Sequence, residues 1–166
     1  MRIIGIDPGL TGALAVLGPS GSIELLVDLP VIRIRKLAWI DGRALRDILI
    51  TRPPGSPTRA YVELVHAMPK TGSAGGFSQG CTLGSILATL QTMSLPIELI
   101  APATWKRALG LITTGTKLTD TQRKRASLDK ARLTFPLAEL GLAKHHGRAE
   151  ALLIALYARE RAPRSA

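Results

Sequence analysis

Three acidic residues far apart in the sequence each interrupt a stretch that is otherwise apolar. Asp7 ends the largely apolar run 2–6 and precedes a Pro-Gly turn, Glu63 lies inside a short apolar run, and Glu150 lies near the start of an apolar segment. A charged carboxylate is costly to bury alone, so each of these needs a cation, a charged partner or hydrogen bonds. Carboxylate oxygens are the ligands that hard divalent cations prefer. The three acids together therefore predict a metal site.

Each acid also has a structural alternative when it is considered alone. An Asp at a strand end often caps a turn, Glu63 could face solvent on an edge strand, and Glu150 could stabilise a helix N-terminus. His146 lies four residues before Glu150, so the two would share a helix face if the helix begins early enough. His146 is therefore a candidate metal ligand or general acid or base, with a flanking surface histidine as its alternative. His145 is the weaker candidate.

The charge of the chain indicates a polyanionic partner. Twenty-two Lys and Arg residues outnumber twelve Asp and Glu residues, which gives a net charge of +10 at pH 7. Residues 1–100 hold nine basic and seven acidic side chains, whereas residues 101–166 hold thirteen and five. Basic side chains near phosphates release condensed counterions, so a concentrated excess favours nucleic acid. Basic surface that serves solubility alone is the alternative.

Length and composition predict one folded domain, residues 1–166. Hydrophobic residues make up 46% of the chain, which is too high for a disordered protein. The sequence has no run of eighteen apolar residues and no signal-peptide pattern, so we expect a cytoplasmic protein that has no membrane partner. The single cysteine, Cys81, excludes an internal disulfide and a cysteine-rich zinc site.

The acids must be positioned by a particular set of elements. Hydrophobic spacing and turn residues predict strands at 2–7, 11–17, 22–29, 59–65 and 96–100. They predict helices at 41–50, 77–93, 104–109, 120–134 and 147–161, and a flexible glycine-rich loop at 72–76. The order of three strands, helix, strand, helix, strand and then further helices is typical of an α/β protein whose five-stranded mixed sheet carries helices on both faces. Chemistry in such sheets gathers at strand ends, where Asp7 lies.

Five ordered segments together span about nine-tenths of the chain, from the start of the first to the end of the last: Ile4–Gly12, Val62–Pro69, Phe77–Gly80, Pro102–Lys106 and Gly147–Ala155. These segments resemble the RuvC-type Holliday junction resolvases of the ribonuclease H-like superfamily, in particular their phage and prophage branch. A lone Asp-Pro-Gly is a weak motif, but five ordered blocks are specific. The resemblance implies a ribonuclease H-like fold and a homodimer that binds a four-way DNA junction and makes symmetric nicks in opposed strands.

The resemblance also implies a metal centre with two Mg²⁺ or Mn²⁺ ions. Asp7, Glu63 and Glu150 match three of the four metal-site positions of the family, and we assign His146 to the fourth, where phage relatives commonly have an Asp. A histidine there removes one negative charge and favours manganese over magnesium. The implied chemistry is two-metal hydrolysis of a phosphodiester, which leaves a 5′ phosphate.

Basic residues after the fifth strand are the candidates for sequence-independent phosphate contacts. The principal ones are Lys106, Lys117, Lys124, Arg125 and Lys130. Phe77 is a candidate for stacking on an unpaired base, with a core position as its alternative, and Trp105 is expected to anchor the core.

Three alternatives for the function follow from the same residues. The chain could be a related nuclease that acts on other branched DNA or on RNA–DNA hybrids. It could bind junctions without cutting them, because the histidine has disabled the metal site. A nucleotide-binding fold of the sugar-kinase and actin type also has a loop like Asp7–Thr11, but this chain is too short for the two lobes of that fold.

Overall fold

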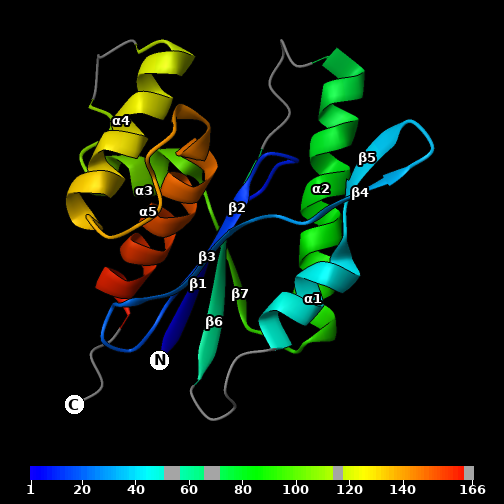
Figure 1. Ribbon diagram of the computed structural model, residues 1–166, viewed down its shortest axis with the longest axis horizontal. Helices are drawn as coiled ribbons and strands as arrows, with labels where there is room; N and C mark the ends of the chain where they lie inside the picture. Colours follow the sequence, from blue (N-terminus) through cyan, green and yellow to red (C-terminus); the bar gives the residue numbers. More distant parts are fainter. Residues whose placement is uncertain (51–56, 66–71, 114–117, 163–166) are drawn as a thin grey trace.

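A five-stranded mixed sheet forms the centre of the protein (Figure 1). The computed structural model describes residues 1–50, 57–65, 72–113 and 118–162. The strands lie in the order β3-β2-β1-β6-β7 and comprise β1 (Arg2–Asp7), β2 (Ala13–Leu17), β3 (Ile23–Asp28), β6 (Thr58–Glu63) and β7 (Ile97–Ile100). β1, β2 and β3 pair antiparallel, whereas β1, β6 and β7 pair parallel. The predicted α/β class and mixed sheet are confirmed.

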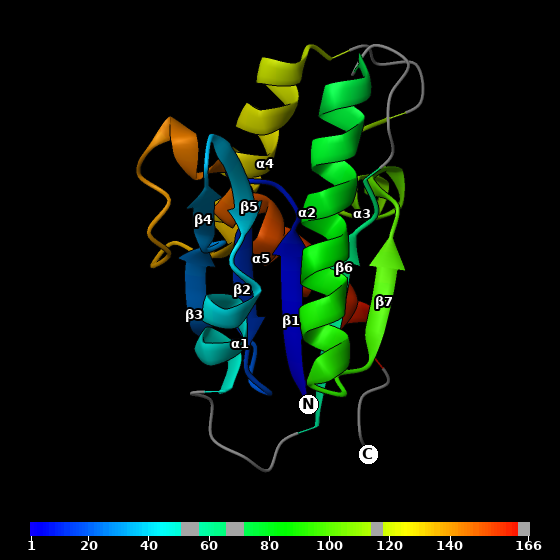
Figure 2. The same cartoon turned by 90° about the vertical axis from the view of Figure 1, so that its right-hand side faces the viewer.

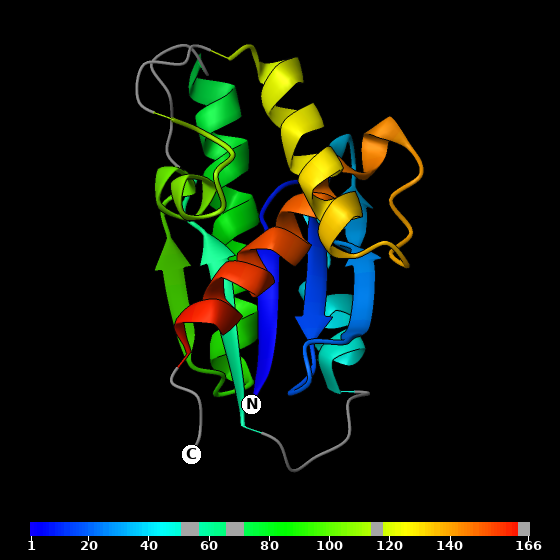
Figure 3. The same cartoon turned by 90° about the vertical axis from the view of Figure 1, so that its left-hand side faces the viewer.

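Helices cover both faces of this sheet. Helices α1 (Gly42–Ile50) and α2 (Gly72–Thr92) lie on one face (Figure 2), and α3 (Pro102–Ala108), α4 (Asp120–Thr134) and α5 (His146–Arg161) lie on the other (Figure 3). Successive side chains of a strand point to opposite faces, and β1 follows this rule. Ile3 belongs to the core under α5, whereas Ile4 and Ile6 belong to the core under α2. β1 is therefore buried on both faces, which explains its nearly continuous apolar sequence.

Two parts of the structure differ from the sequence prediction. Residues 72–76, predicted as a flexible loop, form the first turn and more of α2, which begins at Gly72. Helix propagation is cooperative, so a long helix with a packed second half extends into glycines that would not begin a helix themselves. Residues 31–40, to which no element was assigned, form a separate hairpin of β4 (Val31–Ile34) and β5 (Leu37–Ile40).

Among the described residues, no helix is both long enough and apolar enough to cross a lipid bilayer.

Candidate metal centre

Three carboxylates from distant parts of the chain meet at one edge of the sheet. Asp7 and Glu63 end β1 and β6, and these neighbouring parallel strands place their carboxyl ends side by side. Glu150 comes from the second turn of α5, which crosses the sheet face above β1 (Figure 3). One ligand oxygen from each residue lies within 4.8 Å of the others. Glu63 and Glu150 are buried and Asp7 is partly buried.

Two glycines allow α5 to approach β1 closely enough for this meeting. A Cβ at Gly5 would collide with the Ala151 carbonyl oxygen and lie 2.6 Å from the Ala155 nitrogen. A Cβ at Gly147 would lie 2.7 Å from the Thr11 carbonyl oxygen and 3.1 Å from Asp7 Oδ2. These roles were not predicted from the sequence, although a glycine inside a strand often marks the close approach of another backbone.

Neighbouring side chains hold both glutamates in place. Trp105 Nε1 on α3 donates a hydrogen bond to Glu63 Oε2 at 2.8 Å, and Ser127 Oγ on α4 donates one to Glu150 Oε1 at 2.9 Å. Trp105 is fully buried, as predicted for a core anchor. Its hydrogen bond was not predicted, although a buried indole N–H normally finds a partner. Hydrogen bonds of this kind orient ligands and tune a metal centre.

Lys106 contributes the nearest positive charge. Its Nζ lies 3.1 Å from Glu150 Oε1 and 4.8 Å from the centre of the Trp105 ring. Lys106 was predicted to contact phosphates, and in the structure its ammonium group pairs with a carboxylate of the cluster. One ammonium faces three carboxylates, so the cluster retains an excess of negative charge.

The ionisation of the carboxyls reflects this excess. Burial raises the pKa of Asp7 well above its ordinary value, and the charges of Glu150 and Glu63 raise it further against the opposing effect of Lys106 and Lys124. Burial likewise raises the pKa of Glu63 above its ordinary value. The charge of Lys106 and the hydrogen bond from Trp105 oppose this effect, and the charge of Glu150 adds to it. Crowded, buried oxygens of this kind favour an added cation. The donor set therefore fits a hard divalent metal.

Asp7 should make the metal-free protein less stable as the pH rises. Its pKa is higher in the folded than in the unfolded state. Between those two values the folded state binds more protons, so stability falls with rising pH. We expect Asp7→Asn to be more stable than wild type at pH 7 in EDTA, with a difference that shrinks towards about pH 4, where the unfolded carboxyl titrates. Urea denaturation at several pH values measures this, and an asparagine variant that is less stable at every pH would contradict it.

His145 and His146 lie outside the cluster of three carboxylates. Among the described residues, the group whose ligand atoms lie close enough to share a metal ion comprises Asp7, Glu63 and Glu150. His146 is the first residue of α5 and is partly buried. The backbone N–H of Leu142 donates a long hydrogen bond, 3.5 Å, to His145 Nδ1. The ligand role of His146 stays a prediction.

The predicted DNA contacts lie in different surroundings. Lys124 is exposed on α4 and influences Asp7 through its charge, while Arg125 pairs with Asp129 at 3.7 Å and Lys130 is partly buried. Phe77 is 66% exposed on α2, which excludes the alternative that it is a core residue. Its ring packs edge-to-face with the ring of Trp39, and the two ring centroids lie 6.5 Å apart. The prediction for Lys117 lies outside the described residues.

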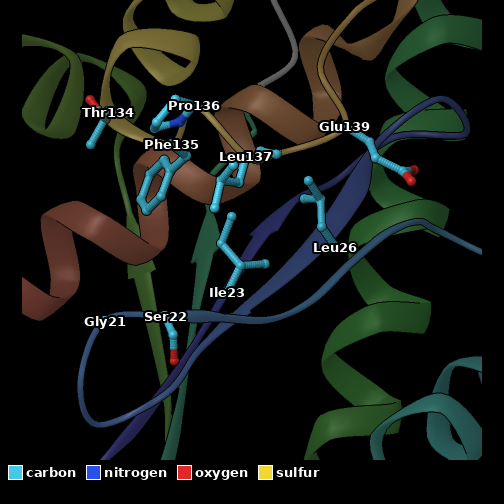
Figure 4. A pocket seen from close by; sticks show the side chains of 10 residues that line it. Gly21, Ser22, Ile23, Leu26, Thr134, Phe135, Pro136, Leu137 and Glu139 are labelled. Atoms are coloured by element: carbon cyan, nitrogen blue, oxygen red, sulfur yellow. The ribbon is translucent and has the colours of Figure 1, made fainter.

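A separate apolar cavity of about 630 Å³ lies between β3 and the segment that follows α4. Phe135 and Leu137 face Ile23 and Leu26 across it (Figure 4). Its lining includes none of the three clustered carboxylates. An apolar lining does not suit phosphate or a divalent cation, so the carboxylate cluster is the candidate site.

Comparison with solved structures identifies the fold. The chain is similar to Thermus thermophilus RuvC in complex with a Holliday junction substrate, with a TM-score of 0.61, 18% sequence identity and coverage of 95% of this chain and 92% of that chain. The chain has the RuvC fold. A second Thermus thermophilus RuvC structure has a TM-score of 0.58 and 21% identity with the same coverage. The predicted ribonuclease H-like fold is thereby confirmed. No protein-family model matches the sequence, and no curated protein matches it either.

Proposed function

We propose that residues 1–166 form one nuclease domain that cuts four-way DNA junctions with the help of Mg²⁺ or Mn²⁺. The observation that carries this proposal is the meeting of Asp7, Glu63 and Glu150 within 4.8 Å at the carboxyl end of the parallel strands. The RuvC fold and the net charge of +10 support the same function. Because its substrate is DNA, we also propose that the protein acts in the cytoplasm.

Asp7, Glu63 and Glu150 would hold the cations, and His146 is the proposed fourth ligand. When bound, a pair of divalent cations lowers the pKa of water and stabilises negative charge on the phosphate during hydrolysis. Trp105 and Ser127 each hold one glutamate oxygen, which limits the reorientation of the carboxylates. Lys106 balances part of the negative charge from beside Glu150. The proposed products are a 5′ phosphate and a 3′ hydroxyl.

The basic excess of the second part of the chain would bind the DNA. Lys124, Arg125 and Lys130 lie on α4, whose neighbour α5 carries Glu150. We propose that these residues, with Lys106 and Lys117, contact phosphates and fix the orientation of the junction without reading its sequence. The exposed ring of Phe77 suits stacking on an unpaired base at the junction centre.

Paired nicks in opposed strands require two active sites, so we propose a homodimer. Helix α2 supports this proposal because Gly80, Gly84 and Ala88 recur at four-residue spacing on an exposed face. Among the described residues, no atom lies within 4 Å of the position that a Cβ would take at Gly80 or Gly84. Small residues of this kind allow the helix of a second copy to approach closely.

A synthetic immobile four-way junction, incubated in Mg²⁺ and then in Mn²⁺, tests the function. We expect symmetric nicks in opposed strands, little cutting of linear duplex, and loss of most of the rate in His146→Ala. Preferred cutting of flaps or RNA–DNA hybrids would favour a related nuclease, and junction binding without cutting would favour a binding protein. A strict monomer by light scattering would contradict paired nicking, and a normal rate for His146→Ala would exclude its ligand role.

A further inference from the structure

The β4–β5 hairpin stands outside the main sheet and is held at its base and by contacts between β5 and α2. Leu29 and Ile40 are buried in the core beneath α2, and the Asp41 backbone N–H donates a hydrogen bond to the Pro30 carbonyl at 2.9 Å. The Trp39–Phe77 contact at 6.5 Å joins the hairpin to α2. Beyond these anchors every residue of 31–37 is exposed, and the hairpin projects past α2 (Figure 1).

The turn of this hairpin has an unfavourable backbone conformation for its sequence. Arg35 and Lys36 connect the strands, with Ile34 paired to Leu37, and Arg35 has a φ of 55°. Two-residue hairpin turns favour Gly, Asn or Asp at such positions, because a side chain is strained there. An arginine in this place costs stability, and a local cost of this kind is typical of functional positions.

The same turn concentrates positive charge. Arg33, Arg35 and Lys36 lie within four residues, and residues 29–40 contain no acid. The ion pairs of the described residues include none from these three side chains. Exposed cations without acidic partners can exchange their counterions for the phosphates of a polyanion.

The direction of the hairpin relates it to the carboxylate cluster. Figure 2 shows its turn directed towards the same end of the molecule as the carboxyl end of β1, where Asp7 lies, with the first half of α2 at that end as well. A branched DNA whose cleaved strand lies at Asp7 has arms long enough to pass this hairpin. We therefore propose that Arg33, Arg35 and Lys36 bind the phosphate backbone of a junction arm away from the cleavage site. This inference rests on the proposed function.

The double variant Arg35→Gly/Lys36→Ser tests the proposal, because glycine removes the charge and also relieves the strained φ. We expect its resistance to thermal unfolding to equal or exceed that of wild type. We expect junction affinity in EDTA to fall about tenfold and the slope of log K against log salt to decrease by about two, one for each lost contact. Fluorescence anisotropy over a range of KCl concentrations measures both quantities.

The matched control is Arg43→Ser/Arg46→Ser, which removes two exposed cations from α1, at the opposite end of the molecule (Figure 2). Its affinity should stay near that of wild type. Equal losses in the two variants would assign the effect to net charge, and an unchanged affinity in the hairpin variant would exclude the contact; either result overturns the proposal.

A membrane is the rival partner, because Ile34 and Leu37 beside the basic turn are exposed apolar side chains. Vesicles that contain phosphatidylserine therefore form a second arm of the experiment. Loss of vesicle binding together with unchanged junction binding in Arg35→Gly/Lys36→Ser would overturn the proposal in favour of a membrane surface. If wild type does not bind the junction at all, the proposed function is overturned. If wild type binds the junction and the hairpin variant binds it equally well, this inference alone is overturned.

Discussion

Replacement of Asp7 by asparagine is expected to reduce junction cleavage by roughly a thousandfold or more while most junction affinity remains, a loss like that caused by removing a charge-stabilising group from an active site. The substitution keeps the shape of the side chain but removes one of the three charges that meet within 4.8 Å. Asp7 is the carboxylate whose pKa both glutamates raise, so its side chain is central to the cluster. Single-turnover cleavage rates and junction affinities measure the two effects.

The control for Asp7→Asn is the same chemical change at an acid outside the cluster. Asp47 lies on α1 with its side chain 59% exposed, and its ion pair with Arg46 is long, 3.7 Å. Asp47→Asn should therefore cut junctions at the wild-type rate. Similar rates for the two variants would remove Asp7 from the catalytic centre.

Replacement of Gly5 by alanine should have the largest effect on folding. The added methyl group would collide with the Ala151 carbonyl oxygen and approach the Ala155 nitrogen to 2.6 Å. β1 pairs with strands on both sides and cannot move away, so α5 must shift. We expect the free energy of unfolding to fall by about 3 kcal/mol or more, at the upper end of the range for overpacked cores. Urea denaturation measures the loss.

Gly141→Ala is the matched control for Gly5→Ala. Among the described residues, no atom lies within 4 Å of the position of a Cβ at Gly141, which follows α4 outside any helix or strand. Its stability should stay within about 0.5 kcal/mol of wild type. If Gly5→Ala were as stable as Gly141→Ala, the close approach of α5 to β1 would not be a requirement of the fold.

The sequence predicts those parts of the fold that short-range signals determine. The bounds of α4, residues 120–134, agree with the structure because Thr119 and Gln122 form a capping box that defines its start. The central strands were predicted because their apolar runs end at turns. Asp7 and Glu63 stood out because a carboxylate is unusual inside such a run.

The remaining features depend on tertiary packing. The hairpin was missed because Arg35 and Lys36 are not the residues that its turn normally requires. The roles of Gly5 and Gly147 follow from the path of α5 across the sheet, which local sequence does not define. Sequence spacing likewise gave no indication that Lys106 would pair with Glu150, 44 positions later in the chain.

We propose that Asp7, Glu63 and Glu150 together hold divalent cations. A crystal soaked in manganese, with anomalous diffraction measured near the manganese edge, tests it most directly. We expect anomalous peaks among these three carboxylates in wild type and their loss in Asp7→Asn. Ordered wild-type side chains that surround no peak, or manganese bound only elsewhere on the protein, would contradict it.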